Sequence, residues 1–149
     1  MKENIKIGII GLGQRGDIML ENPIIPMMKN GAGIKIAAVC DLLPDRVTAA
    51  AEKLEKAGFT RPMEFTDYKE LLKIKELDAV YIAVSWEAHA EVAVAAMHAG
   101  KYVGLEAGGA YSVDDCCKLV RAYEETGTEL MLMENCCYGR RELMALNMA

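Results

Sequence analysis

Six residues near the amino terminus, Gly-Leu-Gly-Gln-Arg-Gly, carry the clearest chemical pattern in the chain. They directly follow an apolar, β-branched run at residues 5–10. In a G-x-G-x-x-G pattern the first glycine permits a tight turn, the second lets the backbone approach a pyrophosphate, and the third lets a helix pack closely on the strand. Free N–H groups at the start of that helix bind phosphate oxygens. The residues expected to contact a dinucleotide here are Gly11, Leu12, Gly13, Gln14, Arg15 and Gly16.

An acidic residue stands where the adenosine ribose of such a dinucleotide would lie. Asp41 directly follows the apolar run at residues 34–40, 30 positions after the first glycine, whereas the usual spacing is about 20. Pro23 and Pro26 lie in the intervening segment and end or kink the first helix, which accounts for the extra length. A helix cap before Pro44 is the alternative role for Asp41. With the glycines upstream, the pattern favours a hydrogen bond to the ribose.

The residues after Asp41 favour NAD over NADP. Leu42 and Leu43 stand where an arginine could hold a 2′-phosphate. Arg46, one turn further on, keeps NADP open as the less favoured cofactor.

Strands and helices alternate along the chain to position these residues. Apolar runs of strand length predict strands at 5–10, 34–40, 62–66, 78–84, 101–106 and 129–134, the third being the weakest. Helical periodicity and caps predict helices between them, one starting at Pro44, one after Ser85, and one after Ser112 that stops at Gly127. This alternation indicates an α/β fold with a parallel, doubly wound sheet, and residues 1–149 form one domain.

Composition excludes several other classes of protein. With 149 residues, 52% hydrophobic and 26% charged, the chain is expected to build one sizeable core. The net charge of −5, without a basic stripe, excludes a nucleic-acid partner. No apolar stretch reaches membrane-spanning length, and the short apolar run at the amino terminus leads into glycines rather than a signal-peptide cleavage site. We therefore expect a cytoplasmic protein without a membrane partner.

The five cysteines do not have the pattern of a metal or disulfide site. Neither Cys-Cys pair has the two-residue gap typical of zinc ligands, and both histidines lie on another segment. Cys116 and Cys117 recur with two valines at helical spacing, which predicts that they pack on the buried face of a helix. Cys136 and Cys137 directly follow an apolar strand. We expect no metal site.

Four segments together resemble the nucleotide-binding half of a Gfo/Idh/MocA-type oxidoreductase: GLGQRG, AAVCDLLPDR, DAVYIAVSWEAHAEVAVAAMHAGKYVGLEAGGA and ENCCYGRRELMALNM. The resemblance covers essentially the whole chain. It implies a Rossmann-type fold, an NAD(P) cofactor and a two-domain enzyme that acts on a sugar, polyol or related hydroxyl compound. The second domain of such enzymes supplies much of the substrate pocket. We therefore expect residues 1–149 to be the dinucleotide-binding domain of a truncated two-domain protein, from which the substrate domain is absent.

One departure from the family pattern concerns the chemistry. Dehydrogenases of this type usually carry Glu-Lys-Pro after the fifth strand, and that lysine assists proton transfer at the hydroxyl being oxidised. Here Glu106 matches, but Ala107 and Gly108 replace the lysine and the proline. A branch that resembles the NAD-dependent α-N-acetylgalactosaminidases also lacks the lysine. Those enzymes oxidise a ring carbon transiently, eliminate the glycosidic group, add water and reduce the ring again.

The resemblance also implies roles for residues outside the glycine pattern. Ser85 and Trp86 are expected to line the nicotinamide side of the site, and Asn135 is expected to contact the carboxamide. His89 is expected to orient the loop before it rather than to transfer protons.

Glu106 and Tyr138 are the candidate catalytic residues of this chain. Glu106 follows the fifth strand, where it could contact the nicotinamide ribose or the substrate; a solvated loop carboxylate is the alternative. Tyr138 matches a tyrosine that contacts substrate in the glycosidase-like branch, or it anchors the turn.

Three functions therefore remain. The first is the NAD-binding domain of an oxidoreductase that acts by hydride transfer on a small, sugar-like substrate. The second is a glycosidase that uses NAD transiently, and the third is a nucleotide-binding module without catalysis. The oligomeric state stays open, a homo-oligomer included.

Overall fold

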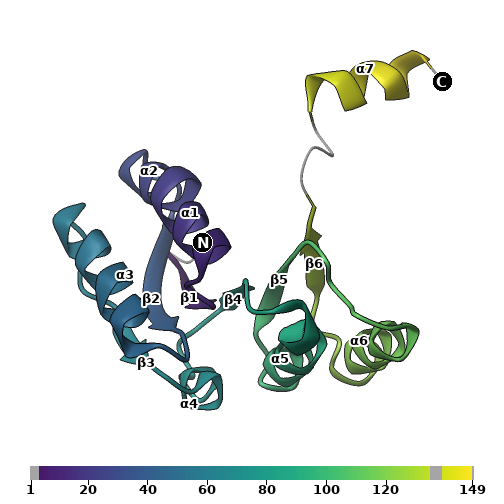
Figure 1. Ribbon diagram of the computed structural model, residues 1–149, viewed down its shortest axis with the longest axis horizontal. Coiled ribbons are helices and arrows are strands. Elements are labelled where there is room, and N and C mark those ends of the chain that lie inside the picture. Colours follow the sequence, from purple (N-terminus) through teal and green to yellow (C-terminus); the bar gives the residue numbers. More distant parts are fainter. Residues whose placement is uncertain (1–3, 135–138, 149) are drawn as a thin grey trace.

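Six parallel strands form one sheet in the computed structural model, which describes residues 4–134 and 139–148 (Figure 1). The strands are β1 (Ile5–Ile10), β2 (Ile34–Cys40), β3 (Met63–Phe65), β4 (Ala79–Ile82), β5 (Tyr102–Glu106) and β6 (Leu130–Met133). Their order across the sheet is β3-β2-β1-β4-β5-β6, and each neighbouring pair is parallel. The predicted doubly wound sheet is confirmed. The last four strands are one to three residues shorter than their apolar runs, because the ends of those runs form the connecting loops.

Eight helical segments connect the strands or follow them in the described part of the chain. They are α1 (Gln14–Met19), η1 (Leu20–Ile24), α2 (Ile25–Lys29), α3 (Pro44–Lys56), α4 (Tyr68–Leu72), α5 (Trp86–His98), α6 (Val113–Thr126) and α7 (Arg140–Met148). The first three form a continuous run in which η1 is a π-helical turn that contains Pro23. Proline has no N–H for the α-helical ladder, so the predicted kink takes this form.

Two helical layers cover the sheet from opposite sides (Figure 1). On one side α1, α2 and α3 pack on strand residues such as Ile9 and Tyr81. On the other side α4, α5 and α6 pack on their sequence neighbours, among them Val80 and Ile82. Alternate residues of one strand therefore belong to different cores, as a central strand requires. Helix α7 lies apart from both layers and contains no buried residue.

Local sequence signals start and stop the helices as predicted. At the start of α6, the Ser112 hydroxyl oxygen accepts a hydrogen bond from the Asp115 backbone N–H at 3.1 Å. Gly127 ends the same helix with φ +65°, the left-handed conformation that glycine adopts without a steric penalty. In α3 the predicted apolar face is buried, from Val47 to Leu54.

The predicted burial of Cys116 and Cys117 is wrong. Both thiols are exposed on α6, and the two valines that share their face, Val113 and Val120, are 81% and 56% exposed. Helix α6 lies at the edge of the sheet beside β6, and only Ala122 of this helix is buried. Periodicity identified a common face correctly, but nothing in the described part of the chain covers that face.

Cys40 lies in the core at the end of β2. None of the described helices is long and apolar enough to cross a membrane.

A buried lysine connects the loop before β4 to the end of α5. Lys101 is 5% exposed, and its ammonium group donates hydrogen bonds to the carbonyls of Ile74, Lys75 and Leu77 at 2.7, 3.3 and 3.0 Å. Since an unpaired carbonyl is costly to bury, one ammonium group that serves three carbonyls fixes this connection.

Replacing this ammonium group should destabilise the fold. Lys101→Met keeps most of the aliphatic stem but leaves the carbonyls without their donor, so we expect the free energy of unfolding to fall by about 1–3 kcal/mol. Urea denaturation followed by circular dichroism measures the change. Lys75→Met is the matched control, because this exposed side chain should contribute less than about 0.5 kcal/mol. Equal stabilities for the two variants would contradict the structural role of Lys101.

Candidate functional site

The glycine turn lies where the chain reverses its direction of winding across the sheet, between β1 and β4. Gly11 follows β1 with φ +95°, and a Cβ there would overlap the carbonyl of Ala83 after β4. A Cβ at Gly16 would overlap the carbonyl of Gly11. A Cβ at Gly13 would meet only the Arg46 guanidinium, at 3.7 Å. Two of the glycines therefore permit backbone packing, and the third leaves an open surface at the start of α1, where ligands bind in open α/β sheets.

Asp41 closes one side of this turn. Its carboxylate is buried and accepts hydrogen bonds from the backbone N–H groups of Leu12 at 2.7 Å and Leu43 at 3.0 Å. Arg46 lies 3.6 Å from the same carboxylate. The alternative role as the cap of α3 is not observed, because Leu43 is the N-cap residue of that helix. Asp41 instead connects the glycine turn to the end of β2.

A cavity of about 440 Å³, the larger cavity, opens beside Asp41 and Gly13. Its walls are mostly apolar and include Cys40, Val92 and the ring of Tyr68. Burial, together with the charges of Asp41 and Asp67, raises the pKa of the Cys40 thiol to about 12. The thiol therefore stays protonated and contributes a neutral surface. The size and polarity suit a flat heterocycle with a ribose at its rim.

A smaller cavity of about 250 Å³ lies on the other side of the turn. It shares Ala83 and Val84 with the larger cavity, so the two meet above the end of β4. The other lining residues are Arg15, Trp86, His89, Glu106 and Ala107. The structure thus brings together residues from the glycine pattern, the loop after β4 and the end of β5.

Glu106 is the charged centre of the smaller cavity and is only 5% exposed. Its Oε1 accepts a hydrogen bond from the Tyr81 hydroxyl at 2.8 Å and lies 3.0 Å from Nε of Arg15. Its Oε2 accepts the backbone N–H of Ala107 at 3.2 Å. Glu106 is therefore not the solvated loop carboxylate of the alternative interpretation. Burial and the hydrogen bond to Glu106 raise the pKa of Tyr81, so the phenol remains a donor.

His89 is almost fully buried one turn into α5. Its Nε2 donates to the carbonyl of Val84 at 3.1 Å, which supports the predicted orienting role. Nδ1 has no hydrogen-bond partner among residues 4–134 and 139–148. Burial lowers the pKa of His89 and favours the neutral ring.

Ser85 and Trp86 lie at the start of α5, where Ser85 lines the larger cavity and Trp86 lines the smaller one. Ser85 is the N-cap residue, but its hydroxyl makes no capping hydrogen bond. The Trp86 indole packs on Gly108, since a Cβ at this glycine would lie 2.8 Å from the indole nitrogen. Gly108 has φ +98°, a conformation that proline cannot adopt. The loop after β5 thus has a shape that the family's usual Glu-Lys-Pro sequence could not take.

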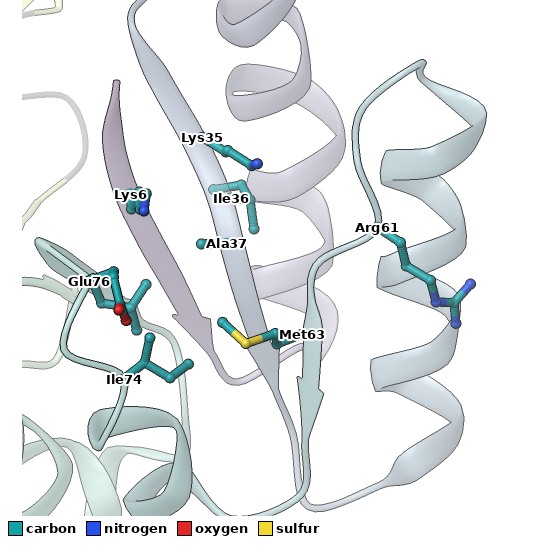
Figure 2. A pocket seen from close by; sticks show the side chains of 9 residues that line it. Lys6, Lys35, Ile36, Ala37, Arg61, Met63, Ile74 and Glu76 are labelled. Atoms are coloured by element: carbon teal, nitrogen blue, oxygen red, sulfur yellow. The ribbon is translucent and has the colours of Figure 1, made fainter. Parts of the chain in front are cut away.

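A third cavity, of about 290 Å³, opens at the opposite edge of the sheet, where β1, β2 and β3 begin (Figure 2). Lys6 and Lys35 contribute cations, but the Arg61 guanidinium points away from it and pairs with Glu55 and Glu64. Ligands in doubly wound sheets bind at the carboxyl ends of the strands, so this cavity is not the candidate site. Within the described residues, no group of three His, Cys, Asp or Glu side chains could hold a metal ion.

Comparison with known families agrees with this geometry. The Gfo/Idh/MocA profile, described as "Oxidoreductase family, NAD-binding Rossmann fold", matches residues 5–134. The chain belongs to this family. A glycosyl hydrolase family 109 protein from Bacteroides thetaiotaomicron is 40% identical over 99% of the chain, and one from Streptomyces niveus is 38% identical over the same share. The chain spans only 31% and 30% of the lengths of these relatives.

Solved structures show the same fold. An NAD-binding oxidoreductase from Klebsiella pneumoniae superposes with a TM-score of 0.81 at 23% identity, covering 97% of this chain and 38% of that one. A probable dehydrogenase from Thermotoga maritima has a TM-score of 0.76 at 27% identity, covering 91% and 38%.

The Rossmann domain brings together most of the residues that the sequence predicted for the site. The structure does not describe two predicted residues, and one residue of the site was not predicted. Asn135 and Tyr138 lie outside the described residues, so their roles remain predictions. Tyr81 was missed because it reads as an ordinary apolar residue of a buried strand. The only available signal was a phenol among aliphatic residues.

The glycines provide a matched pair of substitutions. Gly13→Ala should fold normally, since the added methyl group meets no backbone atom, yet it should weaken NAD binding at least tenfold by blocking the approach of the pyrophosphate. Gly16→Ala should lower the melting temperature, because its methyl group overlaps the Gly11 carbonyl. Thermal melts and calorimetric titration with NAD measure both effects. Undiminished NAD binding by folded Gly13→Ala would rule out the assigned phosphate position.

Proposed function

We propose that residues 1–149 form the dinucleotide-binding domain of a two-domain oxidoreductase that acts on a sugar, polyol or related hydroxyl compound. The observation that carries this proposal is the pair of cavities that meet at the glycine turn on the carboxyl edge of the sheet. NAD would lie with adenosine in the larger cavity, its diphosphate at Gly13 and nicotinamide in the smaller cavity. Family membership and the dehydrogenase-like fold support this placement.

Residues at each end of the site would hold the cofactor in different ways. Asp41 would accept hydrogen bonds from the adenosine ribose, since its carboxylate is already fixed by Leu12 and Leu43. Trp86, His89, Arg15 and Glu106 would line the nicotinamide end. Ser85 lines the larger cavity instead of the predicted nicotinamide side, next to the point where the two cavities meet. NAD, when bound, accepts a hydride from the carbon that bears the hydroxyl group.

The hydroxyl proton must also leave, and a base is needed to receive it. Ala107 cannot supply one. Oε1 of Glu106 is shared between Tyr81 and Arg15, which favours a positioning role for this carboxylate. We therefore propose that the base is Tyr138 or a residue of the substrate domain.

Cofactor choice is tested by calorimetry. NAD should bind more tightly than NADP, because the Asp41 carboxylate repels a 2′-phosphate. Asp41→Ala should weaken NAD binding by about 1–3 kcal/mol, the value of a charge-assisted hydrogen bond. Asp45→Ala is the matched control, because this exposed carboxylate at the start of α3 does not line the larger cavity. Equal affinities for NAD and NADP that do not change in Asp41→Ala would refute the ribose assignment.

A second candidate function is a glycosidase that uses NAD transiently. It is favoured by the loop at Gly108, which departs from the dehydrogenase pattern, and by relatives named glycosyl hydrolase family 109. Oxidation of a ring hydroxyl to a ketone acidifies the neighbouring C–H. The glycosidic group can then be eliminated, water is added to the resulting double bond, and reduction of the ketone returns the hydride. The net reaction is hydrolysis, without consumption of NAD.

The two chemistries differ in their products. The full-length protein should be incubated with NAD and aryl glycosides of N-acetylgalactosamine and related sugars, while aglycone and NADH are followed by absorbance. A dehydrogenase produces one NADH per sugar oxidised and releases no aglycone. Aglycone release without net NADH establishes the glycosidase. If NAD binds but neither product forms, the protein does not catalyse either reaction on the sugars tested. That result favours the non-catalytic nucleotide-binding module.

A further inference from the structure

Tyr81 is a buried phenol that belongs to neither cavity wall. It is 6% exposed in the core beneath α1, and it lies opposite Gly104 in the register of β4 with β5. Glu106 stands two residues further along β5 on the same face of the sheet. A long aromatic side chain can span this diagonal between strands, and the Tyr81 hydroxyl donates to Glu106 Oε1 at 2.8 Å.

Packing in the core does not require the hydroxyl group of Tyr81. A phenylalanine would fill the same core position beside Ile9 and Val39, and burial of a phenol costs free energy unless its hydroxyl finds a partner. That partner is a buried carboxylate at the edge of the smaller cavity. The contact therefore points to a requirement of the site rather than of the core.

Glu106 also contacts residues of two other elements. Oε1 lies 3.0 Å from Arg15 Nε at the start of α1, and Oε2 accepts the N–H of Ala107 in the loop after β5. One carboxylate thus connects α1, β4 and the loop after β5. Helix α1 and the loop after β5 each contribute a residue to the smaller cavity, namely Arg15 and Ala107.

We propose that Tyr81 is a positioning residue for the nicotinamide half of the cofactor, acting through Glu106 on Arg15 and on the backbone of Ala107. This inference rests on the proposed binding of NAD across the two cavities. Without the hydroxyl, the buried carboxylate loses one of its fixed partners and can turn about its own stem. Arg15 and Ala107 then lose the position in which they face the nicotinamide nucleotide. We expect the larger cavity to be unaffected, because the Asp41 carboxylate accepts its hydrogen bonds from Leu12 and Leu43, whereas Glu106 accepts from Tyr81 and Ala107.

The test is a comparison of two ligands on one variant. Tyr81→Phe removes only the hydroxyl group, and we expect the dissociation constant for NAD to rise about threefold to tenfold, part of the value of a hydrogen bond to a charged group. The dissociation constant for AMP, which carries only the adenosine half, should stay unchanged. Calorimetry measures both affinities, and Trp86, the only tryptophan in the chain, provides a fluorescence signal from the smaller cavity. Tyr102→Phe, an exposed phenol on β5, is the matched control.

A double-mutant cycle tests whether Tyr81 acts through Glu106. Glu106→Gln should produce the same selective loss of NAD affinity, and adding Tyr81→Phe to this variant should cause little further loss. Additive losses would show that the two residues act independently and would overturn the proposed route.

Other outcomes separate this inference from the proposed function. If wild-type protein binds AMP but not NAD, the proposed placement of the cofactor fails. If wild-type protein binds NAD while Tyr81→Phe changes neither affinity, or lowers both together with the melting temperature, only the positioning role fails. Should Tyr81→Phe not fold, Tyr81→Met takes its place, because this side chain also fills the core position without a hydroxyl group. A loss of NAD affinity without a loss of AMP affinity is then required.

Discussion

The arrangement of the whole site depends on a close approach of three backbone segments between β1 and β4. Gly11 lies against the carbonyl of Ala83, and Gly16 lies against the carbonyl of Gly11, with no room for a Cβ at either glycine. Because hydrogen atoms alone fit there, α1 starts directly above the end of β1. The strand ends that carry Asp41 and Glu106 are then within reach of the glycine turn, and both cavities open on either side of it.

Two buried carboxylates flank this contact, and each is held by several donors. Asp41 accepts two backbone N–H groups and lies near Arg46. Glu106 accepts hydrogen bonds from the Tyr81 hydroxyl and from the backbone N–H of Ala107, and it lies beside Arg15. A buried charge is tolerated only when its hydrogen-bonding capacity is used. These donors come from separate elements, so each carboxylate fixes the relative positions of the segments that surround the proposed cofactor.

The loop after β5 is where this chain departs from the dehydrogenases that it resembles. Gly108 adopts a left-handed conformation and supports the indole of Trp86. Ala107 contributes a backbone N–H to Glu106 but no titratable group. The described residues therefore account for the shape of the smaller cavity, and the base that we propose for proton transfer lies outside them. This division agrees with a domain that spans about 30% of its relatives' length.

The sequence by itself determined the fold and the position of the glycine turn, because both follow from local rules. Apolar runs of strand length, separated by capped helices, can bury their surface only in a sheet covered on both sides. The position of Asp41 beside the glycine turn could be predicted because this residue directly follows a strand.

Only the tertiary structure decided the surroundings of each side chain. Periodicity placed Cys116 and Cys117 on the apolar face of α6, but whether a face is covered depends on what packs against it. In the same way, the link from Tyr81 to Glu106 arises from the register of two strands that are separated along the chain by a whole helix. Residues 25 positions apart come within a hydrogen bond of each other only when the sheet forms, and no local pattern encodes that distance.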